Sequence, residues 1–299
     1  MTTRHKITFP PWCNDSIHSY GGVLTEYNSL IAKNKIEVAF DCSSVNFITP
    51  LGLNILSCLL FSMLGKNDVF LYRPKHNKVD GYLKDQGFYG EFKIQDDSSL
   101  TSQPRNTSVG LKRMHESIEY SYFEEVETWL NRNIDCPEKM MKEIVNPNVV
   151  EVVHNVRDHS QSRIGCYISA QAYHRNDTLI FVIMDLGIGF LKSLNPRFPS
   201  IGSNSEAIEK AVQEGVSSKS RPNNMGAGLS VICGYLVERG SVEIISHDGY
   251  WTQKKNGQKS SQQLAFSLPG SCVILKFDKS SIRKRFEQEK LDEDLDSFF

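Results

Sequence analysis

A helical pattern with two opposed faces, over residues 149–162, constrains this 299-residue chain more than any other stretch. Valines recur at spacings of three and four and predict an apolar stripe that packs on a core. They are Val149, Val152, Val153 and Val156. Polar residues form a second stripe in register with the first: Glu151, Asn155, Asp158 and Ser162. Taken alone, this pattern is typical of a surface helix whose polar face is solvated.

A second interpretation gives the polar face a chemical role. Asn155 offers a neutral oxygen to a hard cation such as Mg²⁺, and Glu151 can orient or deprotonate a nucleophile. One helical turn apart, the two side chains can point at one metal-bound oligophosphate. This interpretation requires the other half of a nucleotide site elsewhere in the chain.

Composition and charge exclude several classes of protein. A hydrophobic share of 39% and a charged share of 23% are ordinary for a globular chain. A net charge of −1 gives no general attraction to nucleic acid or to an anionic membrane. The longest apolar run, residues 51–64, contains polar interruptions and predicts no membrane span, and the first residues lack a signal-peptide core. The seven cysteines never form CxxC pairs and mostly lie in apolar runs, which predicts core residues of a cytoplasmic protein.

The length favours two domains, and residues 1–95 have the order of a βαβ unit. We expect strands at 35–41 and 69–72, a turn at 46–52, and helices at 53–64 and 78–86. This order resembles the STAS domain of anti-sigma factor antagonists. Phe47-Ile48 stands before the family's turn, Gly52 matches its glycine, and Gly87-Phe88 matches its ending.

The resemblance implies a regulatory or docking module, with one departure from the family pattern. Leu51 occupies the position that is phosphorylated in STAS domains, and leucine cannot accept phosphate. The module would therefore not act as that phospho-switch. A generic small α/β domain is the alternative interpretation.

Beyond residue 95 the sequence predicts a linker, a second domain and a tail. Polar residues at 96–112 predict the linker, residues 113–278 the domain, and residues 279–299 a charged tail that is either a solvated helix or a flexible end. Within the domain we expect a helix at 116–131, with Tyr120, Phe123, Val126 and Leu130 in its core stripe. We also expect strands at 164–173 and 178–184, and Asn146-Pro147 as the start of the two-faced helix.

The second of these strands leads directly into Asp185-Leu-Gly-Ile-Gly189. Glycines at positions 187 and 189 would let the backbone approach a flat ring closely, while the Asp185 carboxylate accepts a hydrogen bond from an exocyclic amine. The same pattern is common in ordinary glycine-rich bends.

A long segment of small and polar residues follows, from 215 to 228, and ends in Gly226-Ala-Gly228 directly before an apolar helix at 229–237. Glycines that open a helix present free N–H groups to phosphates, and the helix dipole reinforces them. Lys219 and Arg221 could reach a terminal phosphate from this segment. A flexible loop before a helix is the ordinary alternative.

Together, the three motifs closely resemble the GHKL ATP-binding fold, the family of gyrase, histidine kinases and MutL, over about residues 140–278. The resemblance implies an α/β sandwich, with a mixed sheet and helices on one face, that binds ATP and Mg²⁺. It also implies that residues 240–246 and 270–277 are the final strands of this sheet. It implies that Asn155 holds Mg²⁺, Glu151 is the catalytic carboxylate, and Asp185 binds the adenine amine. The remaining implied nucleotide-binding residues are Asp158, Gly187, Gly189, Lys219, Gly226, Gly228 and Leu229.

The spacing of Glu151, Asn155 and His159 resembles that of the anti-sigma factor serine kinases, although His159 can equally cap a helix. A sensor histidine kinase is disfavoured, because His115-Glu116 lacks the following sequence of a phosphoacceptor helix. We therefore expect a cytoplasmic Ser/Thr protein kinase or ATPase that acts on a regulatory partner protein. An ATP-dependent switch without turnover and a scaffold that binds no nucleotide are alternatives, and a homodimer stays open.

Overall fold

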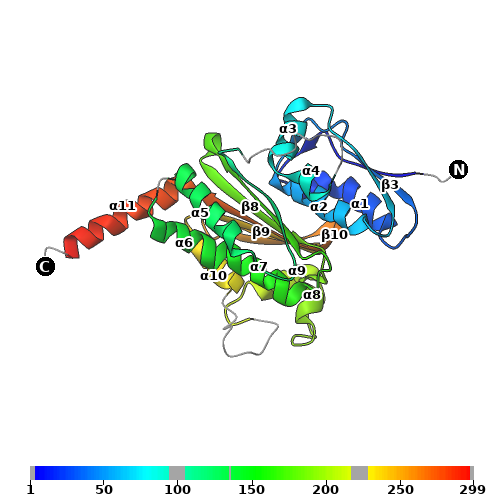
Figure 1. Cartoon of the computed structure of the whole chain (residues 1–299). Coiled ribbons are helices and arrows are strands. Elements are labelled where there is room, and N and C mark those ends of the chain that lie inside the picture. The colour runs from blue at the N-terminus through cyan, green and yellow to red at the C-terminus, as the bar shows by residue number, and fades with distance from the viewer. Residues whose placement is uncertain (1–3, 94–104, 135, 217–227, 297–299) are drawn as a thin grey trace.

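The chain folds into four layers, in which two β-sheets alternate with two layers of helices (Figure 1). The computed structural model describes residues 4–93, 105–134, 136–216 and 228–296, with side chains up to residue 288. A parallel sheet is the outer layer of the N-terminal part, and helices separate it from an antiparallel sheet. More helices cover the other face of the antiparallel sheet. The fold is α/β, as the sequence predicted.

The N-terminal sheet has three parallel strands in the order β1-β3-β5. The strands are β1 (His5–Thr8), β3 (Glu37–Asp41) and β5 (Asp68–Tyr72), and the crossover helices are α1 (Gly21–Leu30) and α2 (Pro50–Met63). The predicted βαβ unit is confirmed as β3, α2 and β5. Both crossovers move along the sheet in the same direction, so right-handed connections place α1 and α2 on the same face.

Short elements complete the N-terminal part. They are β2 (Trp12–Cys13), η1 (Ile17–Tyr20), β4 (Phe47–Ile48), α3 (Asn77–Asp85) and α4 (Phe88–Glu91). Helix α3 is the polar helix that the sequence predicted. Gly87 follows it with φ +75°, a left-handed conformation that glycine adopts without steric cost.

Charged side chains cover the outer face of the parallel sheet. Arg4 forms an ion pair with Glu37 at 2.9 Å, and its guanidinium lies 3.8 Å from the ring centre of Phe70. Lys6 forms an ion pair with Asp41 on the same face. Parallel sheets are usually buried on both faces, so these charges make an exposed parallel sheet compatible with water.

The larger sheet has five strands in the order β6-β7-β8-β10-β9. They are β6 (Ser108–Met114), β7 (Cys166–Tyr173), β8 (Thr178–Asp185), β9 (Gly240–Gln253) and β10 (Lys259–Asp278). Each neighbouring pair is antiparallel, so the prediction of a mixed sheet is wrong. Short connections join β7 to β8, through η4 (His174–Asn176), and β9 to β10, and a hairpin makes its two strands antiparallel.

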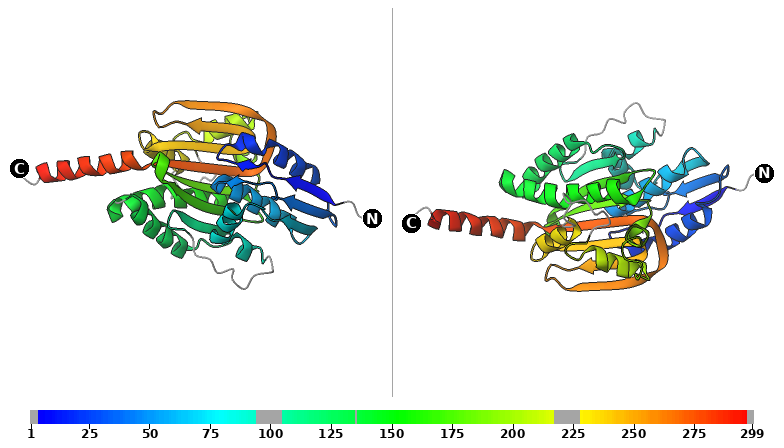
Figure 2. Two further views of the ribbon diagram at one scale, coloured as in Figure 1. Left: turned by 90° about the horizontal axis from the view of Figure 1, so that it is seen from above. Right: turned by 90° about the horizontal axis from the view of Figure 1, so that it is seen from below.

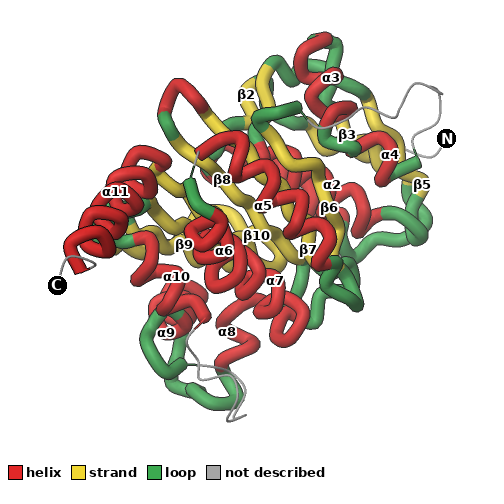
Figure 3. The backbone as a smooth tube through the Cα atoms, turned by 60° about the vertical axis from the view of Figure 1, so that its left-hand side comes forward, coloured by secondary structure: helices red, strands yellow, loops and turns green. Residues whose placement is uncertain are grey.

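Helices cover one face of this sheet, as predicted (Figure 3). They are α5 (Tyr120–Ile134), α6 (Glu138–Ile144), η2 (Val145–Val150), α7 (Glu151–Asn155), η3 (Val156–Ser160), α8 (Gly189–Leu194), α9 (Asn204–Ala211) and α10 (Gly228–Leu236). The predicted valine stripe is confirmed, because Val149, Val152 and Val153 are buried in the core and Val156 packs against it. Tyr120, which the sequence placed in the core stripe of α5, is exposed. Tyr122 is buried in the core instead.

Helix α2 is buried between the two sheets and joins the two parts of the chain. Of its 14 residues, 12 are buried. One continuous buried cluster contains side chains of α1 and α2 together with Tyr167, Val182 and Ile274 of the antiparallel sheet. The expected division into a docking domain and a separate ATP-binding domain is therefore not confirmed, since the two parts share this core.

Polar contacts also cross between α2 and the antiparallel sheet. The side-chain amide of Asn54 donates a hydrogen bond to the hydroxyl of Ser169 on β7. The thiol of Cys58, one turn further along α2, donates to the backbone carbonyl of Met184 at 3.5 Å. Met184 is the residue before Asp185, which the sequence prediction assigns to adenine binding. Helix α2 therefore contacts the end of β8 directly next to that residue.

The two-faced helix begins earlier than predicted, because Pro147 lies within a continuous helical segment from Glu138 to Ser160. A proline cannot donate to the carbonyl four residues before it and normally breaks a helix. Here the turns of η2 are wider than an α-helix, and the side-chain amide of Asn148 donates to the carbonyl of Glu143 at 2.7 Å. The carbonyl that Pro147 leaves without a donor is therefore satisfied.

Two further boundaries differ from the sequence prediction. Residues 108–112 of the expected linker belong to β6, which pairs with β7 at the edge of the antiparallel sheet. The strands expected at 240–246 and 270–277 are the inner halves of a much longer hairpin, β9–β10. Its outer half contains many polar residues, which resemble a loop in sequence.

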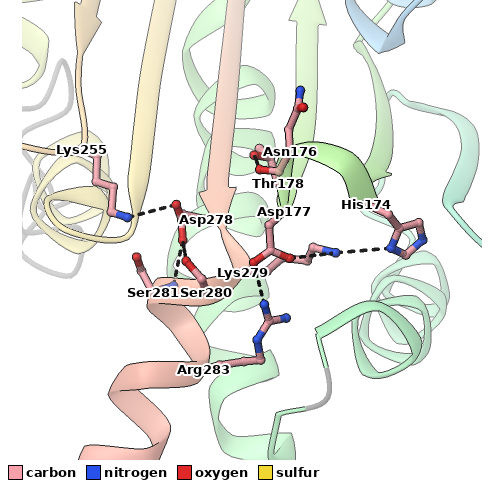
Figure 4. A network of polar contacts seen from close by, with 10 residues as sticks. All are labelled: His174, Asn176, Asp177, Thr178, Lys255, Asp278, Lys279, Ser280, Ser281 and Arg283. Atoms are coloured by element: carbon pink, nitrogen blue, oxygen red, sulfur yellow. Dashed lines mark hydrogen bonds and ion pairs between the residues drawn. The ribbon is translucent and has the colours of Figure 1, made fainter.

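Helix α11 (Lys279–Asp296) forms the described part of the charged tail and leads away from the sheet (Figure 2). Asp278 accepts a backbone N–H of its first turn at 2.8 Å. Asp177, in the turn between β7 and β8, forms ion pairs with Lys279 at 3.4 Å and Arg283 at 2.6 Å (Figure 4). These contacts fix the start of α11 at the end of the sheet opposite Asp185.

All seven cysteines are buried and free, which confirms their prediction as core residues. Burial raises the pKa of the Cys13 thiol to about 12 and that of Cys233 to about 11. None of the helices in the described ranges is long and apolar enough to cross a membrane.

The contact between Asn54 and Ser169 can be tested by a double-mutant cycle. Asn54→Ala should lower the free energy of unfolding by about 1–3 kcal/mol, because it leaves a buried hydroxyl without a partner. Ser169→Ala should then cost less in the Asn54→Ala background than in the wild type, with a coupling of about 0.5–3 kcal/mol. Urea unfolding of the four proteins measures it, and additive effects would show that the two side chains do not interact.

Candidate functional site

The candidate site lies at the end of the antiparallel sheet where β8 terminates in Asp185. The Asp185 side chain is 2% exposed, and its Oδ1 accepts the backbone N–H of Gly187 at 2.6 Å. Burial raises the pKa of Asp185 from 3.8 to about 7, while the hydrogen bond from Gly187 opposes this shift. A buried carboxyl group held by one backbone donor retains capacity for a hydrogen bond with a ligand.

Asp185 belongs to a row of polar residues across three strands. Ser271 of β10 lies directly opposite Asp185, and Ser246 of β9 lies opposite Ser271. Residues opposite each other in antiparallel strands share a face, so all three residues lie on one face of the sheet. It is the face covered by helices α5–α10, because Ile183, Val273 and Ile244 of the same strands pack there. The sequence prediction missed Ser246 and Ser271. In the sequence, each serine stands at one end of a largely apolar run, which was the available signal.

The glycines of the Asp185–Gly189 loop are needed for packing within the protein. A Cβ on Gly187 would lie 2.1 Å from the carbonyl oxygen of Ser160, at the end of η3. That carbonyl accepts the backbone N–H of Ile188 at 2.7 Å. Gly189 has φ +73°, and a Cβ there would lie 2.5 Å from the ring of His247. The sequence prediction assigned these glycines to the approach of a ligand, and the packing of the loop gives a second reason for glycine at both positions.

Glu151 and Asn155 lie one turn apart on α7, next to the start of α10. A Cβ on Gly228, the first residue of α10, would lie 2.6 Å from Oε1 of Glu151 and 3.1 Å from Nδ2 of Asn155. Side chains from the predicted helix thus meet the last glycine of the predicted phosphate-binding segment. The sequence separates these residues by more than 70 positions, and the fold brings them together.

Two carboxylates influence each other on this helix. Burial raises the pKa of Glu151, and the negative charge of Asp158 raises it further. Asp158 itself forms an ion pair with Arg157 at 2.9 Å. A carboxylate whose pKa is raised holds a proton more readily, as a general base requires.

The other predicted residues have different outcomes. Leu229 is buried in the core beneath α10, so its side chain serves packing. Lys219, Arg221 and Gly226 lie outside the described residues. His115 lines a cavity of about 190 Å³ together with Arg157 and Gln161.

The residues present fit a Mg²⁺–oligophosphate ligand in their chemistry. Mg²⁺ prefers oxygen ligands and usually keeps several waters and phosphate oxygens, so one or two protein oxygens are sufficient. The Asn155 carboxamide and the Glu151 carboxylate supply such oxygens, beside Gly228 at the start of α10. The first N–H groups of a helix have no partner within the helix and favour anions.

Comparisons with known proteins give little help for this chain. No family model matches the sequence, and no curated protein sequence matches it. Among solved structures, the chain is similar to the ATPase region of Saccharomyces cerevisiae topoisomerase II, at 12% sequence identity and a TM-score of 0.28. The match covers 64% of this chain and 53% of that chain, so this chain spans about half the length of its neighbour.

The raised pKa of Asp185 predicts a pH-dependent stability. Its neutral form is favoured in the fold, so this contribution is complete below about pH 4 and is lost as the pH rises through about 7. Asp185→Asn keeps an oxygen for the Gly187 N–H and does not titrate. Urea unfolding at pH 5 and pH 8 should show the wild type losing up to about 3 kcal/mol relative to the variant, because the carboxyl group loses its proton in the fold about two pH units above pH 5. An unchanged difference between the two proteins would contradict a buried carboxyl group.

The packing of Gly187 gives a second prediction. Gly187→Ala should lower the free energy of unfolding by about 1–3 kcal/mol, because the new methyl group meets a backbone oxygen that cannot move freely. Gly234→Ala in α10 is the matched control, since no atom lies within 4 Å of its Cβ position. The control should be neutral or stabilising by about 1 kcal/mol, because alanine favours a helix. Equal effects of the two substitutions would contradict the tight packing of the loop.

Proposed function

We propose that this protein binds ATP with Mg²⁺ at the end of the antiparallel sheet, between Asp185, α7 and the start of α10. The observation that carries the proposal is the convergence of three separate sequence motifs at one place. Glu151 and Asn155 lie beside Gly228, and the Asp185–Gly189 loop is held against the end of the same helical segment through Ser160. An arrangement of the GHKL type accounts for all three motifs.

Each residue has a role in this proposal that follows from its chemistry. Asp185 accepts a hydrogen bond from the exocyclic amine of adenine. The N–H of Gly187 already holds Oδ1 of Asp185, which orients the second carboxylate oxygen for this contact. Backbone N–H groups at the start of α10 bind phosphate oxygens. Asn155 supplies an oxygen ligand for Mg²⁺, which would neutralise phosphate charge when bound.

Glu151 makes turnover of ATP the favoured form of the proposal. It lies next to Gly228, and burial raises its pKa, so it is suited to accept a proton from an attacking water or hydroxyl group. A water nucleophile gives an ATPase, and a serine or threonine hydroxyl of a partner gives a protein kinase. We propose that the protein is a cytoplasmic enzyme of one of these two kinds, either an ATPase or a Ser/Thr protein kinase, and that it acts on a regulatory partner protein.

A switch without turnover is the second candidate, and the position of α2 favours it. Helix α2 contacts the carbonyl of Met184, directly before Asp185, from the opposite face of the sheet. A change at Asp185 could therefore alter the packing of the N-terminal part. In this candidate the STAS-like part is the element through which ATP controls a partner.

Nucleotide binding can be tested with thermal unfolding and calorimetry in ATP and Mg²⁺. Wild-type protein should be stabilised by ATP with Mg²⁺, because a ligand that binds only the folded state shifts unfolding by mass action. Asn155→Ala should weaken the binding about tenfold or more, through loss of a metal ligand. Asn146→Ala is a matched control, because it removes an exposed amide from the same helical segment outside the site. No stabilisation of the wild type by ATP would contradict the proposal.

Glu151→Gln separates the two candidates. In an enzyme, the variant should still bind ATP but should lose at least a hundredfold in phosphate release or transfer, because general base catalysis contributes about that much. In a switch, it should retain ATP-dependent partner binding. Wild-type protein that binds ATP and releases or transfers no phosphate would exclude the enzyme and leave the switch.

A further inference from the structure

We propose that Ser246 and His247 are positioning residues that hold the Asp185–Phe190 loop in the form that selects adenine. The inference rests on the proposed function, since it concerns the ATP site. Neither residue belongs to the motifs that suggested this site, and both come from β9, two strands away from β8.

The two side chains contact the loop two residues apart, at Phe190 and at Ile188. The hydroxyl of Ser246, which is fully buried, accepts the backbone N–H of Phe190 at 3.0 Å. Nε2 of His247 lies 3.2 Å from the carbonyl oxygen of Ile188. A carbonyl oxygen only accepts, so Nε2 carries the hydrogen in this contact. Because η3 also binds Ile188 through Ser160, the loop is held from two sides.

The backbone of β9 is shaped to direct His247 at the loop. His247 has φ +50°, a left-handed conformation that is uncommon for a residue with a side chain. The pairing of β9 with β10 is irregular at this point. The next residue, Asp248, accepts hydrogen bonds from Asn204 at 2.6 Å and Gln263 at 2.8 Å. These two bonds hold the turn of the backbone that aims the imidazole at Ile188.

The position of the loop decides how Asp185 can meet a ligand. Gly187 donates to Oδ1 of Asp185, so displacement of the loop would free the carboxyl group to rotate. A rotated carboxyl group no longer presents an oxygen in the direction of an adenine amine. Contacts with the phosphates depend on α7 and α10 and would not change. The loss of Ser246 or His247 should therefore weaken recognition of the base and not of the triphosphate.

The test compares ATP with inosine triphosphate, which has an oxygen in place of the amine, by calorimetry with Mg²⁺. His247→Gly removes the imidazole and tolerates the positive φ. It should raise the Kd for ATP about tenfold and leave the Kd for inosine triphosphate within about twofold. Ser246→Ala, which leaves the backbone at 247 unchanged, should produce the same selective loss. His247→Gln, which restores an N–H donor of similar reach, should recover most of the affinity for ATP.

Glu238→Gly is the matched control, because Glu238 also has a positive φ, +72°, and lies exposed in the turn between α10 and β9. It should bind both nucleotides as the wild type does. Equal weakening of the two nucleotides by His247→Gly and Ser246→Ala, or no weakening at all, would overturn the positioning role while the wild type still binds ATP. A wild type that binds neither nucleotide would overturn the proposed function itself, and the positioning role with it.

Discussion

The burial of both faces of the antiparallel sheet is the constraint on which the rest of the structure depends. Helices α5–α10 cover one face, and α1 and α2 cover the other. Where helices cover both faces of the sheet, its strands are apolar on both sides. Strand β8 is the clearest case, since it is buried from Leu179 to Asp185. The carboxyl group of Asp185 is therefore placed in a poorly hydrated environment by the fold itself.

This burial explains the chemical character of the candidate site. An isolated carboxyl group at the end of a buried strand is costly when charged, and a single backbone donor from Gly187 compensates only part of the cost. Proteins keep such groups where they have a task, and a ligand donor would provide the missing hydrogen bond. Burial also raises the pKa of Glu151, which lies on helix α7. The site thus combines two carboxyl groups with raised pKa at one end of the sheet.

The sequence predicted the elements of this site better than their connections. Glu151, Asn155 and Gly228 were identified from spacing, and the fold brings them together. The mixed sheet was implied by the family resemblance and was wrong. Ser246 was missed because spacing carries no information about which strands are neighbours in a sheet. Pro147 suggested a helix start, because a side-chain bond such as that of Asn148 to a backbone carbonyl is not visible in sequence. Nor does periodicity reveal that α2, apolar on all sides, lies between two sheets.

The burial of every cysteine has a practical consequence for spectroscopy. Thiolates are the reactive form, all seven thiols are buried, and burial raises the pKa of thiols such as those of Cys13 and Cys233, so the native side chains are poor targets for maleimide or methanethiosulfonate reagents. A single cysteine introduced on the exposed side of the folded chain would therefore be labelled selectively, without first removing the seven native ones. A pair of such labels, one on α3 and one on α9, would make distance changes between the two parts of the chain directly measurable in the otherwise unmodified protein.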